Sequence, residues 1–140
     1  MDPADPQDPA ELLLSDLAER VPEVRHALVV SADGVALAAS GPALAGHLER
    51  LAAITASLIS LAAGAAAVSG YGPVTQAVVV MEQGTFVIMA VDEGASLAVL
   101  TTADADLDQV AYEMTMLVER SATTLTSPAR SPDPDSQSGG

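Results

Sequence analysis

The stretch of sequence that decides the fold is ALAGHLERLAAITASLISLAAGAAAVS, residues 43–69. As a helix it would carry apolar or small side chains on nearly every side, with Glu49 and Arg50 as its charged residues. A helix that is apolar all round is buried on more than one side. A chain of 140 residues holds little other protein to bury it. We therefore expect a membrane or a second copy of the chain to supply the remaining cover.

The composition of this stretch favours the second copy. Residues 51–69 carry no charge, which approaches the roughly 20 apolar residues of a membrane-spanning helix. However, alanine contributes little to the free energy of insertion, and serine, threonine and glycine are interspersed. The first residues, MDPADPQDPAE, are acidic and lack the basic segment of a signal peptide. Small side chains let two helix backbones approach closely, so we expect a helix–helix seam and no direct membrane insertion.

Charge and composition exclude several classes of function. The formal net charge is −14 and the sequence contains no lysine, which excludes a nucleic-acid-binding surface and disfavours anionic membranes. The absence of cysteine excludes disulfides, thiolate catalysis and sulfur metal sites. Without cysteine or a signal sequence, the cytoplasm is the expected compartment.

Both ends of the chain are rich in proline, aspartate and serine and have no apolar periodicity, which is typical of disorder. We expect disordered tails at residues 1–7 and 126–140 and one domain over residues 8–125. The domain begins with a helix whose predicted N-cap is Asp8, with Glu11 completing a capping box and Pro22 ending the helix.

Two strands and the long helix follow. The sequence HALVVSADGVALAAS, residues 26–40, reads as two strands around Asp33-Gly34, because Asp-Gly supplies the positive φ angles of a tight hairpin turn. Pro42 is expected to start the long helix, and Gly70 is expected to stop it in the left-handed conformation.

The rest of the domain is predicted as three strands and a helix. The strands are TQAVVVMEQ (75–83), TFVIMAV (85–91) and ASLAVLTT (95–102), and their short connections make them antiparallel neighbours. The last helix is expected to be capped by Asp104. The predicted fold is α+β, a five-stranded antiparallel sheet with helices on both faces.

This pattern resembles the Roadblock / dynein light chain family over about residues 8–125. The resemblance rests on the hairpin LVVSADGVALAAS, the small-residue helix after it and the meander VVVMEQGTFVIMAVDEGASLAVLTT. It implies a homodimer in which the third strands pair edge to edge into a ten-stranded sheet, while the long helices pack across the two-fold axis. The residues expected in this dimer interface are Ala56, Ser60, Gly64, Ala67, Val78 and Val80.

The sequence offers no constellation for chemistry, so we expect no catalytic, cofactor-binding or metal-binding residues and no enzyme activity. No glycine-rich stretch carries the Lys-Ser/Thr of a phosphate-binding loop. His26 and His47 lack partners at ligand or triad spacing. The run Asp104, Asp106, Asp108 lacks the glycine and the final glutamate of a calcium loop, and helix capping explains it better.

The resemblance also implies a partner, because bacterial Roadblock proteins are encoded with a small Ras-like GTPase, in actinomycetes beside a sensor-kinase-like protein. The function expected is a regulator or adaptor of such a GTPase, with His47, Glu49 and Arg50 as the contact surface. An assembly module that recruits a kinase or other partner without a GTPase is the alternative. A third hypothesis, a small-molecule sensor, is disfavoured because the expected core lacks convergent polar groups.

Overall fold

The predicted fold class is confirmed. The computed structural model describes residues 8–41, 46–92 and 94–126. It contains five strands and three helices in the predicted order: α1 (Pro9–Arg20), β1 (Val24–Ser31), β2 (Ala36–Ser40), α2 (Leu48–Ser69), β3 (Gln76–Met81), β4 (Gly84–Asp92), β5 (Ala95–Thr102) and α3 (Leu107–Thr126). The predicted tails are residues 1–7 and 126–140. Residues 1–7 and 127–140 lie outside the described residues, and α3 extends to Thr126, one residue past the predicted domain boundary.

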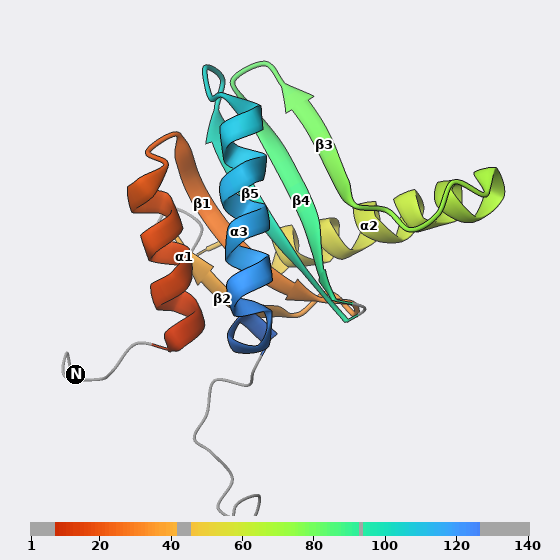
Figure 1. Ribbon diagram of the computed structural model, residues 1–140, viewed down its shortest axis with the longest axis horizontal. Helices are drawn as coiled ribbons and strands as arrows, with labels where there is room; N and C mark the ends of the chain where they lie inside the picture. The colour runs from red at the N-terminus through yellow and green to blue at the C-terminus, as the bar shows by residue number, and fades with distance from the viewer. Residues whose placement is uncertain (1–7, 42–45, 93, 127–140) are drawn as a thin grey trace, which may run out of the picture.

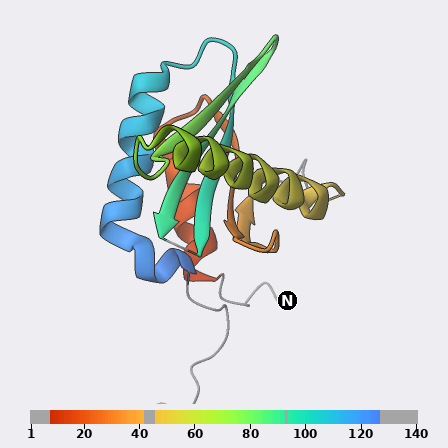
Figure 2. The same ribbon diagram turned by 90° about the vertical axis from the view of Figure 1, so that its right-hand side faces the viewer.

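The strands form one antiparallel sheet in the order β2-β1-β5-β4-β3. In Figure 1, α1 and α3 lie in front of the sheet and α2 lies behind it; Figure 2 shows α2 crossing the strands on its own side. Strands β2 and β3 are therefore the two edges of the sheet within one protomer.

Each face of the sheet has its own core because side chains alternate between the faces along a strand. Buried Leu28, Phe86 and Ile88 pack against α2 on one face. The larger core lies on the other face, under α1 and α3, where Leu14, Leu97 and Met114 are fully buried. The α2 face thus holds the smaller core.

The hairpin between β1 and β2 is confirmed, but its turn is longer than predicted. Ser31 and Val35 pair around a three-residue loop, and Gly34 alone has a positive φ, of 90°. Asp33 keeps a negative φ, and its carboxylate accepts a hydrogen bond from the Ser31 hydroxyl. The loop is a turn followed by Gly34 in the left-handed conformation. It therefore needs a single residue with a positive φ angle, whereas the prediction assigned positive φ angles to both Asp33 and Gly34.

Two of the three predicted helix starts need correction. Helix α2 begins at Leu48, with Gly46 and His47 in a turn, and Pro42 lies outside the described residues. The α3 cap is Asp106, whose carboxylate accepts from the backbone N–H groups of Asp108 and Gln109 at 3.0 and 3.3 Å. Asp8 is the N-cap residue of α1, as predicted, although its side chain makes no capping hydrogen bond.

The Asp104 carboxylate instead accepts from the Thr102 hydroxyl at 2.6 Å. This hydrogen bond holds the Asp104 side chain at the end of β5, so Asp104 does not cap α3. The predicted helix stop is confirmed: Gly70 has φ 73° and its N–H donates to the Ala66 carbonyl.

Helix α2 is mostly exposed within one protomer. It is the one helix among residues 8–41, 46–92 and 94–126 that is long and apolar enough to cross a membrane. However, only 11% of its most apolar 18-residue stretch is buried. Its second half projects past the edge strand β3 (Figure 1). Ala52 and Thr55 are its buried residues, so the sheet of the same protomer covers little more than one side of the first half.

Candidate functional site: interaction surfaces on α2 and β3

The predicted helix seam lies along one side of α2. Ala56, Ser60, Gly64 and Ala67 follow helical spacing, and all but the half-buried Ala56 are exposed. A Cβ built on Gly64 meets nothing within 4 Å, so the protomer leaves this side open. Ser60 lines a hollow of about 530 Å³ between α2 and the β1–β2 turn. The seam therefore offers a surface of small side chains to another molecule.

The two predicted interface residues of β3 lie on the other face of the sheet. Ala77 and Val79 pack into the α2-side core, opposite Ile88 and Phe86. By alternation along the strand, Val78 and Val80 face the α1/α3 side. They are 43% and 74% exposed. The structure thus does not bring these valines together with the α2 seam, although both belong to elements at the same edge of the protomer.

The predicted partner-binding residues lie together at the start of α2. His47, Glu49 and Arg50 are all exposed and line a hollow of about 620 Å³ with Gly46 and Leu48. Within the described ranges, no ion pair or hydrogen bond engages the Arg50 guanidinium. That cation is free to meet a carboxylate or phosphate of another molecule.

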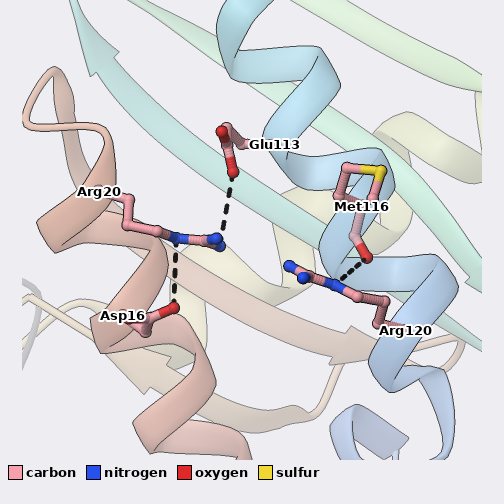
Figure 3. A network of polar contacts seen from close by, with 5 residues as sticks. All are labelled: Asp16, Arg20, Glu113, Met116 and Arg120. Atoms are coloured by element: carbon pink, nitrogen blue, oxygen red, sulfur yellow. Dashed lines mark hydrogen bonds and ion pairs between the residues drawn. The ribbon is translucent and has the colours of Figure 1, made fainter.

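Two other arginines are engaged within the protomer (Figure 3). Arg20 contacts Asp16 at 3.2 Å and Glu113 at 3.5 Å, which ties α1 to α3. Arg120 donates from Nε to the Met116 carbonyl at 3.3 Å, just before the non-helical Ser121. These contacts have structural roles, which leaves Arg50 as the more available cation on a helix.

The histidines and aspartates do not assemble a metal site. Among the described residues, no group of three or more histidine, aspartate or glutamate side chains is arranged to hold a metal ion. His26 has a buried Nδ1 without a hydrogen-bond partner in the described part of the chain. Burial, and secondarily the neighbouring Arg25, lowers the pKa of His26 below its ordinary value of 6.5.

Sequence reasoning missed a second line of exposed residues on α2. Ile54, Leu61 and Val68 are 45%, 73% and 90% exposed and lie on the side of the helix opposite the buried Ala52 and Thr55. They recur every seven residues, the spacing that keeps side chains in line along a helix and that could have revealed them. We call them the outer α2 stripe. Arg50 lies on the same side, one turn before Ile54.

Comparisons with known proteins agree with this architecture. A family model described as the Roadblock/LC7 domain matches residues 10–101. A Roadblock/LC7 domain from Streptomyces avermitilis is 32% identical, with a TM-score of 0.76 over 84% of this chain and 98% of that one. A second structure of such a domain, from the same organism, is 38% identical, with a TM-score of 0.67 over 81% and 99%.

A more distant structure shares the fold alone. The gliding protein MglB from Thermus thermophilus is 21% identical, with a TM-score of 0.73 over 83% of this chain and 87% of that one. No curated protein matches the sequence. The family model spans most of the described domain, and the Streptomyces structures match this chain over nearly their full length. This chain belongs to the Roadblock/LC7 family.

Proposed function

We propose that the chain is a non-enzymatic, cytoplasmic, homodimeric regulator or adaptor of a small Ras-like GTPase in a bacterial signalling module. The observation that carries the proposal is the exposed side of α2, where Arg50 precedes the outer α2 stripe. Large apolar side chains on a surface, next to an unpaired cation, are typical of protein interfaces.

The family resemblance supplies the class of partner, and the fold shared with the gliding protein MglB is in keeping with it. The chain carries no phosphate-binding loop, so its dimer would act on the nucleotide site of the GTPase. Arg50 is the first residue to examine as an arginine finger. It lacks a supporting motif, so we favour positioning of the GTPase's own residues, or scaffolding.

The test is titration calorimetry with the Ras-like GTPase encoded beside this chain, loaded with GDP or with a GTP analogue. We expect binding in at least one state. Leu61→Ser should weaken binding about tenfold or more, because interface energy is concentrated in a few central side chains. Arg50→Ala should weaken it as well. Tyr112→Ser is the matched control, because Tyr112 is 60% exposed but belongs to α3.

Failure to bind in either nucleotide state would reject the regulator and favour the assembly module. Binding that Arg50→Ala leaves unchanged would reject only the predicted contact surface at the start of α2. Measured GTP hydrolysis with the Arg50→Ala variant would separate the arginine finger from scaffolding, since loss of a finger reduces the rate by several orders of magnitude.

A further inference from the structure

The outer α2 stripe, formed by Ile54, Leu61 and Val68, is symmetric about its middle residue. Leu61 is separated from each of the other two by the same number of residues, about two helical turns in either direction. A two-fold axis through Leu61, at right angles to the helix, would therefore bring the stripe onto itself in the reverse direction. Leu61 would face Leu61, and Ile54 would face Val68. A surface that is complementary to itself in this way fits a second copy of the same chain.

The expected homodimer leaves the outer α2 stripe exposed. Antiparallel strands of one sheet are related by an axis perpendicular to the sheet, so pairing through β3 places both α2 helices on the same face. The stripe lies roughly 100° around the helix from the α2 seam, on the side opposite the buried Ala52 and Thr55. That side of α2 points away from the sheet (Figure 2). Each homodimer thus presents two apolar stripes on one face.

The α2 seam and the stripe are centred at the same position along the helix. The seam runs from Ala56 to Ala67, and Leu61 lies near its middle as well as at the middle of the stripe. The two-fold axis of the homodimer and the two-fold axis through the stripe would then meet. Perpendicular two-fold axes that meet close an assembly at four chains, whereas contacts that do not close generate filaments. The arrangement of residues on α2 is therefore compatible with a closed pair of homodimers.

The charges of α2 favour the antiparallel arrangement. Residues 51–69 carry no charge, so two chains of net charge −14 can approach there without acidic side chains between them. The arrangement also brings Arg50 of one helix to the last turn of the other, where the helix dipole is negative. That last turn has no basic residue of its own, and within the described ranges no ion pair or hydrogen bond engages the Arg50 guanidinium. Arg50 thus gains a partner that its own protomer does not supply.

We propose that two homodimers associate face to face through their outer α2 stripes, with Leu61 on Leu61 and Ile54 on Val68 of the second copy. Three large side chains per helix make a small interface, so the association is weak and depends on concentration. It would cover Arg50 and the stripe, which form the surface of the proposed GTPase contact. Self-association would then withhold this surface from the GTPase. This consequence rests on the proposed function, whereas the association itself does not.

Sedimentation velocity of the full-length chain, from low micromolar to nearly millimolar concentration, measures the association. We expect homodimers to convert into assemblies of four chains as the concentration rises, and more completely at higher salt, because salt screens the repulsion between acidic chains. Leu61→Glu should stay a homodimer throughout, since it places carboxylates against each other at the two-fold axis. Leu61 is 73% exposed, so circular dichroism should stay unchanged. Tyr112→Glu, on the exposed side of α3, is the matched control and should associate like the parent chain.

Cysteine cross-linking tests the antiparallel arrangement, because the sequence contains no cysteine. Leu61→Cys should form a disulfide between two copies, increasingly so as the concentration rises, because the two-fold axis brings the two residues together. Val68→Cys alone should cross-link far less, whereas a mixture of Ile54→Cys and Val68→Cys should form the mixed disulfide. Gly64→Cys, on the α2 seam, is the control. It should cross-link to the same extent at every concentration, because its partner lies within the homodimer.

Three results would overturn the proposal: homodimers that never associate, association that Leu61→Glu leaves unchanged, or Val68→Cys cross-linking to itself as readily as Leu61→Cys. Adding the GTPase, in the nucleotide state that binds, should convert assemblies of four chains into GTPase-bound homodimers. Binding without that conversion would reject the masking of the GTPase surface. A GTPase that binds in neither state would reject the proposed function, and the cross-links would still decide the association.

Discussion

His26 is a residue whose burial links folding to pH. The pKa of its imidazole is lowered from 6.5 by burial first and by Arg25 second, and its Nδ1 finds no hydrogen-bond partner among the described residues. Protonation is therefore easier in the unfolded chain than in the folded one. At pH values between the lowered folded pKa and 6.5, the unfolded state binds more protons, so the free energy of unfolding rises with pH there.

We expect His26 to cost the protein stability as the pH falls below about 6.5, and His26→Gln to remove that part of the acid sensitivity. The measurement is urea unfolding of the parent chain and the variant at pH 7.5 and pH 5.5. His47→Gln, at the exposed start of α2, serves as the control and should follow the parent chain. An identical drop in stability for the parent chain and His26→Gln would contradict this role.

At the scale of elements, the strands were the most predictable because alternation and Asp-Gly or Gln-Gly turns mark their limits. The bounds predicted for the last strand, 95–102, match β5. Helix starts were less predictable, because several polar residues in a row can each serve as the cap. Asp104 and Asp106 are chemically equal, and a hydrogen bond to Thr102 decides between them. The Thr102–Asp104 bond is a local contact between residues two apart, but residue type alone does not show which of the two aspartates makes it.

The interaction surfaces on α2 and β3 were also only partly predictable from the sequence. The sequence indicated that α2 needs cover, and the structure agrees, since few of its side chains are buried. Which face of the sheet Val78 and Val80 occupy depends on the register with β4, and a run of three valines fits either face. For that reason the face on which Val78 and Val80 lie could not be predicted from residues 75–83 alone.

The α2 seam can be tested with a charge placed where the protomer has open space. Gly64→Glu should split the homodimer, because burying an unpaired carboxylate costs several kcal/mol or more, on the order of what holds a dimer together. The protomer should stay folded, since a side chain at Gly64 meets nothing within 4 Å. Analytical ultracentrifugation with circular dichroism measures both effects.

Ala65→Glu adds the same charge one residue further along α2 and points to a different side of the helix. It should leave the dimer intact. The reverse pattern, in which Ala65→Glu dissociates the dimer and Gly64→Glu does not, would place the interface on the other flank of α2.

For the whole molecule, the exposed α2 and the open edge of β3 lead to one expectation about assembly. An apolar helix projecting beyond the sheet and an unprotected strand edge would make a lone protomer prone to aggregate. Val68, which lies in the projecting half of α2, is 90% exposed. A two-fold pairing along β3 would satisfy the backbone of the edge strand and bring the projecting half of α2 over the second copy.

We therefore expect a stable homodimer of 14.1 kDa chains at low micromolar concentration, measured by light scattering coupled to size-exclusion chromatography. The dimer should persist in detergent-free buffer and stay in the supernatant when centrifuged with phospholipid vesicles, because a second copy covers the apolar side of α2. A stable monomer would contradict the expected pairing. Sedimentation with vesicles and loss of the dimer would assign the cover of α2 to a membrane, the use that its length and composition also permit.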